Sequence, residues 1–74
     1  MLIHYSCGYI LFKDGTPTEI ETVWNGLDKW TKLFLLHYLE ITNFDPIATN
    51  PNFSDLPDPV KTSLTDKIGQ KIKQ

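Results

Sequence analysis

The first part of the chain alternates between hydrophobic and polar positions. From residue 2 to residue 12, one side of an extended segment carries a large hydrophobic set, Ile3, Tyr5, Cys7, Tyr9 and Leu11. Residues 18–24 alternate again, with Ile20 and Trp24 on one side and Glu19 and Glu21 on the other. A period of two residues is typical of a β-strand. Since Asp14-Gly15 between the segments suits a turn, the pattern predicts a β-hairpin over residues 1–24.

Hydrophobic side chains extend almost all the way round the next segment, residues 27–41. One row recurs at steps of three or four residues, Trp30, Phe34, Tyr38 and Ile41, and its neighbours add Leu33, Leu35, Leu36 and Leu39. Surface helices usually keep hydrophobic residues to one stripe, so this pattern predicts a helix that is buried on several sides. Asp28 is its predicted N-cap. A short chain has little else with which to cover this helix, so the surplus surface predicts contact with a second copy or another protein.

The pattern in the remainder of the chain predicts an ordered loop, followed by a helix that is hydrophobic on one side only. Residues 43–58 are rich in proline and have hydrophobic residues spaced along them as anchors, Phe44, Ile47, Phe53 and Leu56. Asp58-Pro59 suits a helix start, and a hydrophobic row at four-residue steps predicts a helix over 59–72: Val60, Leu64, Ile68 and Ile72. The prediction is an α+β fold in a single domain, residues 1–74. Its N-terminal β-hairpin packs on the central hydrophobic helix, and the order of elements is β-β-α-α.

Composition narrows the classes of function. The chain has 74 residues, with seven lysines, no arginine and nine acids, and a net charge of −2. Arginine is the favoured side chain for bidentate contacts to phosphate and guanine, so its absence disfavours specific binding to DNA or RNA. Cys7 is the only cysteine, which excludes an internal disulfide. The lone thiol and a first segment unlike a signal peptide favour a cytoplasmic protein, and no hydrophobic run is long enough to span a membrane.

The residues that could carry chemistry do not form a recognisable set. His4 and His37 lie far apart in sequence and have no carboxylate at a supporting spacing, so we interpret them as structural or surface residues. Cys7, predicted in the middle of a strand, is interpreted as a buried, inert thiol. The sequence therefore predicts no catalytic residue, no metal site and no cofactor. Glu19 and Glu21 are predicted on the solvated face of an edge strand, where they could contact a basic partner.

These observations favour a non-enzymatic binding protein over an enzyme. A compact, mildly acidic chain fits a small regulator or inhibitor that docks on a larger protein or complex, of the type that phages and mobile elements encode against host defences. A homodimer is also expected. The predicted partner-binding residues are Trp30, Phe34, Leu35 and Tyr38 on the helix, and Glu19 and Glu21 on the hairpin. The alternative is a nucleic-acid-binding module that uses the lysines near the C-terminus, Lys61, Lys67, Lys71 and Lys73.

Overall fold

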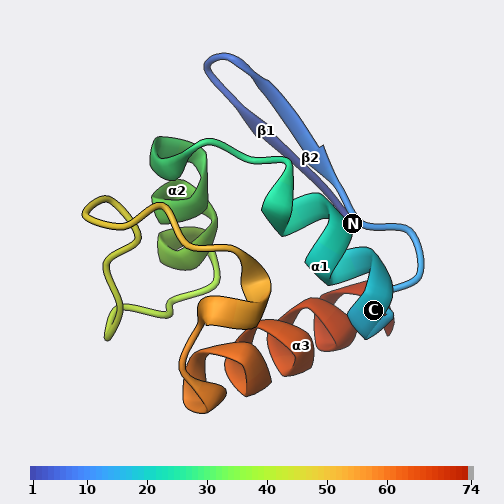
Figure 1. Ribbon diagram of the computed structural model, residues 1–74. Coiled ribbons are helices and arrows are strands. Elements are labelled where there is room, and N and C mark those ends of the chain that lie inside the picture. The colour runs from blue at the N-terminus through green and yellow to red at the C-terminus, as the bar shows by residue number, and fades with distance from the viewer. Residues whose placement is uncertain (74) are drawn as a thin grey trace.

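The N-terminal hairpin is shorter than the sequence predicts, and its turn comes earlier. The structure, a computed structural model, describes residues 1–73. Strands β1 (Leu2–Tyr5) and β2 (Gly8–Leu11) pair antiparallel across the two-residue connection Ser6-Cys7 (Figure 1). The chain therefore reverses in the middle of the predicted first strand. The predicted turn at Asp14-Gly15 leads instead into a helix.

The early reversal changes which side chains share a face of the hairpin. Ile3 lies opposite Ile10, and both are buried. Tyr9 and Leu11 are exposed on the other face. The predicted grouping of Tyr9 and Leu11 with Ile3 is wrong, because the two turn residues interrupt the alternation and shift its phase by one position.

The second predicted strand, residues 18–24, is a helix, α1 (Pro17–Asn25). Ile20 and Trp24 are buried on one side of it, and their four-residue spacing fits a helix as well as a strand. The helix start decides between the two. The Thr16 hydroxyl accepts the Glu19 N–H at 3.2 Å, and Pro17 occupies the first turn. This combination of Thr-x-x-Glu and an early proline is a start signal for a helix, and it outweighs the strand preference of β-branched residues.

The central helix, α2 (Lys29–Tyr38), is capped at both ends by its local sequence. The Asp28 carboxylate accepts the Thr31 N–H at 2.7 Å, which confirms Asp28 as the N-cap. The helix ends earlier than predicted, because Glu40 adopts a left-handed conformation with φ of 61°. Around it, the N–H of Ile41 donates to the Leu36 carbonyl at 2.8 Å and the N–H of Glu40 donates to the His37 carbonyl at 3.0 Å. These two bonds form a Schellman motif, which satisfies the last carbonyls of the helix.

The proline-rich segment packs against the body of the protein. Pro46, Pro51 and Leu56 are buried, and Phe44 and Phe53 are half-buried against the core. A short 3₁₀ helix, η1 (Phe53–Asp55), ends the segment, and α3 (Asp58–Lys73) follows within one residue of the predicted start.

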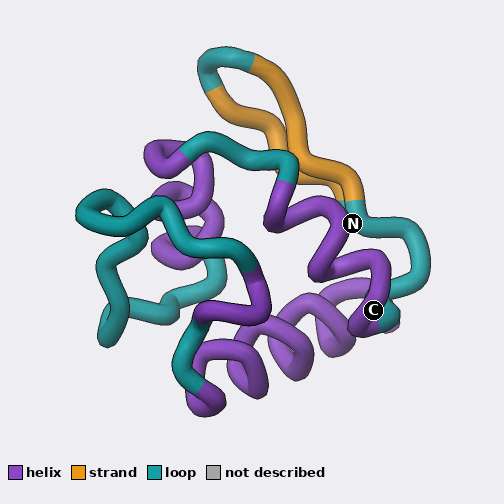
Figure 2. The backbone as a smooth tube through the Cα atoms, in the orientation of Figure 1, coloured by secondary structure: helices purple, strands orange, loops and turns teal. Residues whose placement is uncertain are grey.

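The three α-helices gather at one end of the hairpin, whose tip projects from them (Figure 1). In Figures 1 and 2 the hairpin extends above the three α-helices, and α3 runs along the opposite side of the molecule. The α+β class, with an N-terminal hairpin followed by helices, is confirmed. The buried side chains form one core, drawn from every α-helix and both strands: Ile3, Ile10, Phe12, Ile20, Trp24, Leu35, Leu36, Leu39, Ile41, Leu56, Val60, Leu64 and Ile68. Within residues 1–73, no helix combines the length and hydrophobicity needed to cross a bilayer.

Candidate protein-binding surface

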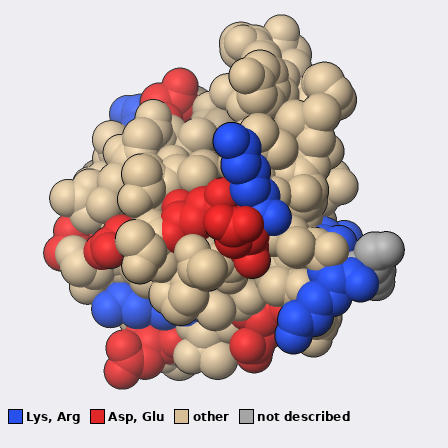
Figure 3. Space-filling model, turned by 90° about the vertical axis from the view of Figure 1, so that its right-hand side faces the viewer, with Lys and Arg blue, Asp and Glu red and all other residues tan. Residues whose placement is uncertain are grey.

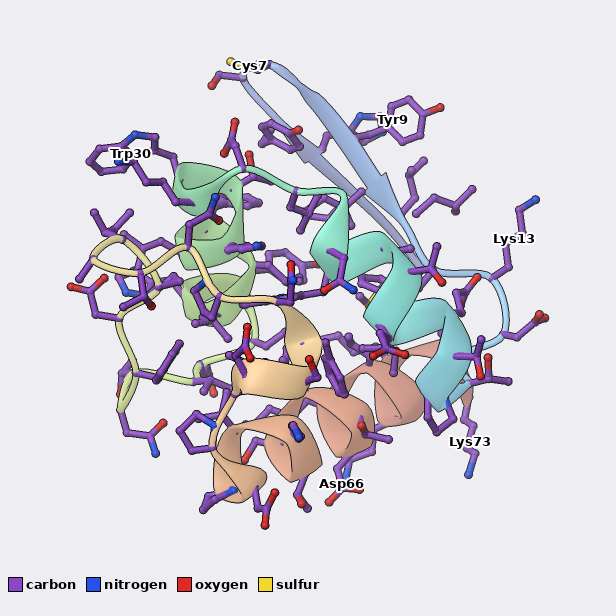
Figure 4. The ribbon with its side chains drawn as sticks, viewed as in Figure 1. Cys7, Tyr9, Lys13, Trp30, Asp66 and Lys73 are labelled. Carbon is purple, nitrogen blue, oxygen red and sulfur yellow. The ribbon has the colours of Figure 1, made fainter. Side chains whose placement is uncertain are left out.

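Three aromatic side chains form a stripe on the outer side of α2. Trp30, Phe34 and Tyr38 follow one another at four-residue steps, so they share one side of the helix. Their exposed fractions are 64%, 36% and 45%. Trp30 extends away from the body at the edge of the molecule (Figure 4). We call these three residues the aromatic stripe.

Side chains from two other elements extend the aromatic stripe. The ring of Tyr5, from β1, lies with its centroid 5.6 Å from that of Phe34, and the rings of Phe34 and Tyr38 are 6.3 Å apart. At the other end, the Lys71 ammonium lies 5.4 Å from the centre of the Tyr38 ring. The cation–π contact brings α3 to the end of the stripe. The surface therefore runs from the hairpin across α2 to the last helix.

A hollow lies beside Trp30, where the tip of the hairpin faces the first turn of α2. Its volume is about 410 Å³, and its walls include Tyr5, Cys7, Trp30 and Phe34. More of the accessible lining is hydrophobic than polar. The Trp30 indole and the Phe34 ring both line this hollow.

Leu35 does not belong to this surface. It is only 1% exposed and lies in the core with Leu36 and Leu39. Its prediction as a partner-binding residue is corrected, because Leu35 lies on the core side of α2, which also carries Lys32 and its bonds to the proline-rich loop. In a folded monomer, Leu35 is not accessible to a partner.

The covered side of α2 also holds a buried lysine that the sequence did not reveal. Lys32 is only 2% exposed, and its ammonium donates to the Pro51 carbonyl at 2.8 Å and to Asn50 Oδ1 at 3.0 Å. The Trp24 indole N–H donates to the same carbonyl at 2.9 Å. Burial lowers the pKa of Lys32, and Asp28 partly opposes this shift. Lys32 thus fastens the proline-rich loop to α2 rather than binding a partner.

Glu19 and Glu21 do not lie on a strand, and they do not act together. The Glu19 carboxylate accepts the N–H groups of Lys13, Asp14 and Gly15 at 2.8–3.0 Å. These bonds, that of Lys13 first, lower the pKa of Glu19. Glu21 is exposed further along the helix, and a two-residue step turns it away from Glu19. Glu19 is therefore an anchor for the loop before α1. The Thr16-Pro17-Thr18-Glu19 start signal could have revealed this role.

The four lysines of α3 do not form a continuous basic stripe. Lys67 and Lys71 line a hollow beside Tyr38 and Glu40. Lys73 lines another, with Asp14 and Asp66. Figure 4 shows Asp66 and Lys73 at the lower edge of the molecule, away from Trp30. Lys67, Lys71 and Lys73 are therefore split between two places, each of which also contains a carboxylate, and Lys61 lies apart from both near the start of α3.

The remaining candidate residues are dispersed. Cys7 lies at the exposed tip of the hairpin, so its interpretation as a buried thiol is wrong. Its position in the turn, rather than in the middle of a strand, explains the exposure. His4 and His37 are both exposed, on the hairpin and on α2 respectively. Among residues 1–73, no group of three or more His, Cys, Asp or Glu side chains is arranged to hold a metal ion.

Comparison of the chain with protein-family models, with curated proteins and with solved structures finds no match. The feature that distinguishes this surface is the aromatic stripe, with Tyr5 and Lys71 at its two ends.

Proposed function

We propose that this protein is a non-enzymatic binding protein that docks on a larger protein through the aromatic stripe. The observation that carries the proposal is the exposure of three large aromatic side chains on a single helix, with Trp30 at 64%. Tryptophan and tyrosine are favoured anchors of protein interfaces, because they bury a large area and lose little conformational entropy. A regulator or inhibitor of the larger protein is the functional class that fits best.

The surroundings of the aromatic stripe also fit an interface. Polar and charged groups lie at its ends, Asp28 beside the first turn of α2 and Lys71 over Tyr38. A hydrophobic centre with a polar rim is the usual arrangement of a protein interface. The hollow beside Trp30 offers a place for one side chain of the partner, and a filled hollow of this kind is typical of a binding hot spot.

The proposal can be tested with matched surface variants. Wild-type protein, Trp30→Glu and Leu2→Glu are immobilised and exposed to a lysate of the cells that produce the protein, and bound proteins are identified by mass spectrometry. Leu2 is a suitable control because it is 50% exposed and lies on the hairpin, outside the aromatic stripe. We expect a protein that binds the wild type and Leu2→Glu and that is lost with Trp30→Glu. The same proteins on all three samples would contradict the proposal.

The purified partner then allows a quantitative test. Removing a hot-spot tryptophan typically costs at least about 2 kcal/mol, so we expect Trp30→Ala to raise the Kd by a factor of about 30 or more. A nucleic acid would behave differently. Binding of labelled single-stranded DNA or RNA at about 50 mM salt that weakens steeply with added salt would instead favour the lysine-mediated alternative.

A further inference from the structure

The hairpin has a surface unlike the rest of the molecule. Residues 1–12 contain no aspartate, glutamate, lysine or arginine, although the chain as a whole has sixteen such residues. Leu2, Tyr9 and Leu11 are 50%, 63% and 39% exposed on its outer face. Figure 3 shows the projecting part of the molecule free of charged side chains, whereas the body below it carries both signs. Edge strands are usually protected from pairing by charged residues or proline, and this hairpin has neither.

The register identifies the backbone groups that point outward. The Met1 amino group donates to the Phe12 carbonyl at 2.7 Å, and the Phe12 N–H donates to the Met1 carbonyl at 2.9 Å. Hydrogen-bonded and non-hydrogen-bonded pairs alternate along an antiparallel ladder, so Leu2–Leu11 and His4–Tyr9 are non-hydrogen-bonded pairs. The N–H and C=O groups of these four residues therefore point to the free edges.

We propose that two copies of the chain associate through the edge of β2. The outward backbone groups of this edge belong to Tyr9 and Leu11, whose side chains are also large and exposed. In an antiparallel pair around a two-fold axis at Ile10, Tyr9 of one copy pairs with Leu11 of the second copy, and Leu11 pairs with Tyr9. Each of these pairs exchanges two backbone hydrogen bonds. The two hairpins then form a four-stranded sheet.

We infer a second copy of the chain as the partner at this edge, because the hairpin has no charged side chains to repel it and the edge is complementary to itself. Each chain carries a net charge of −2, so two copies repel one another in general. The hairpin has no charged side chains, so it brings no carboxylates or lysines of its own into the contact. The edge is also self-complementary, since Tyr9 and Leu11 exchange roles across the axis, as an isologous dimer requires. Cross-strand contacts between an aromatic and an aliphatic side chain add to the backbone pairing.

The position of the edge leaves the proposed protein-binding surface free. In Figure 1, β2 lies on the side of the hairpin away from α2. In Figure 4, Tyr9 and Trp30 point to opposite sides of the molecule. A standard interface needs about 800 Å² from each partner, a large share of the 4628 Å² surface of this chain, and one strand edge supplies less. We therefore expect a reversible dimer whose population depends on concentration.

Sedimentation velocity from about 10 μM to about 1 mM tests the proposal with two matched proline variants. Leu11→Pro removes an N–H from the β2 edge, and Leu2→Pro removes one from the β1 edge. Neither N–H is used within the hairpin, because Leu2 and Leu11 form a non-hydrogen-bonded pair. We expect wild type and Leu2→Pro to change from one chain to two as concentration rises, and Leu11→Pro to remain a single chain. A wild type that stays a single chain throughout would overturn the proposal, as would a Leu11→Pro variant that still dimerises.

Amide hydrogen exchange of the wild type gives a second measurement that needs no variant. At concentrations where the dimer forms, the amides of Tyr9 and Leu11 should exchange more slowly than those of Leu2 and His4. Dilution should remove the difference. Slow exchange at Leu2 and His4 instead would assign the contact to β1, and equal rates at all four amides would exclude an edge contact altogether. This measurement decides the question even if Leu11→Pro fails to fold.

Discussion

At the scale of single residues, the buried ammonium of Lys32 gives the protein a pH-dependent stability. The pKa of Lys32 in the folded protein lies below its value of 10.5 in the unfolded chain, because burial disfavours the charged form. Between these two values the unfolded chain binds more protons than the folded protein, so the free energy of unfolding rises as the pH increases towards 10.5. Below the folded pKa, the cost of burying the charge is constant.

Urea unfolding at several pH values between 7 and 10.5 measures how the free energy of unfolding depends on pH, with Lys32→Met as the comparison. Lys32→Met leaves every other ionisable group of the chain in place, so the difference between the two curves isolates Lys32. We expect the wild type to gain stability relative to Lys32→Met as the pH rises. Parallel curves would show that Lys32 has the same pKa in both states.

Glu19 produces the opposite dependence at low pH. Its pKa is lowered from 4.5 by the N–H groups of Lys13, Gly15 and Asp14, so the folded protein favours the carboxylate. This contribution is present above pH 4.5 and is lost as the pH falls through the lower folded pKa. We expect Glu19→Gln to be less stable than wild type near neutral pH, with a smaller difference in acid. Glu21→Gln is the control on the same helix, and an equal loss for both variants would contradict the role of Glu19.

At the scale of elements, α2 has two sides with different roles. Leu35→Ala should lower the free energy of unfolding by about 2 to 5 kcal/mol, because it leaves a cavity in the core. Trp30→Ala should change it by no more than about 0.5 kcal/mol, since the indole is mostly exposed. Chemical unfolding of both variants checks this division of α2 into a core side and an exposed side. A large loss for Trp30→Ala would place this residue in the core instead of at an interface.

The end of α2 contains a strained position that a substitution can relieve. Glu40 has φ of 61°, a conformation that costs an ordinary residue roughly 1 to 2 kcal/mol and glycine almost nothing. We expect Glu40→Gly to raise the free energy of unfolding by about 1 kcal/mol, as measured by urea titration. Glu40→Ala is the control, because it removes the same charge and keeps the strain. If both variants gain equally, the charge rather than the backbone is responsible.

The elements also show where sequence patterns are sufficient and where they are ambiguous. The helix over 59–72 was predictable, because the row Val60, Leu64 and Ile68 extends over a segment longer than an ordinary strand and Asp58-Pro59 marks its start. The segment over 18–24 was not, because Ile20 and Trp24 share a face in a helix and in a strand alike. Its cap at Thr16 was the signal that could have decided the matter.

At the scale of the whole molecule, a single carbonyl links three segments that are distant in sequence. The Pro51 carbonyl accepts from the Trp24 indole of α1 and from the Lys32 ammonium of α2. A further bond joins the Phe53 N–H to Asn25 Oδ1 at 2.8 Å. The proline-rich loop is thereby fixed across both helices, and it covers surface that α2 would otherwise expose.

This arrangement predicts the effect of replacing Trp24. Trp24→Phe keeps a large hydrophobic ring and removes the N–H that donates to Pro51, so we expect the free energy of unfolding to fall by about 1 to 3 kcal/mol. Amide exchange at residues 50–56 should accelerate in the same variant, because the loop loses one of its attachments. Unchanged exchange there would show that Lys32 and Asn25 hold the loop without Trp24.

The sequence by itself determined the α+β class, the helices α2 and α3, and the presence of more hydrophobic surface on α2 than one face can bury. These features depend on local periodicity and capping, which act within a few residues. Only the tertiary structure decided which side of α2 is covered, and it divided Leu35 in the core from Trp30, Phe34 and Tyr38 outside. It also places Tyr9 and Leu11 on the outer face of the hairpin, whereas the sequence pattern predicts them on the same face as Ile3. The physical reason is that burial depends on contacts between segments that are distant in sequence. A periodic pattern shows which residues share a face of a helix or strand, but it does not show which other segment packs on that face.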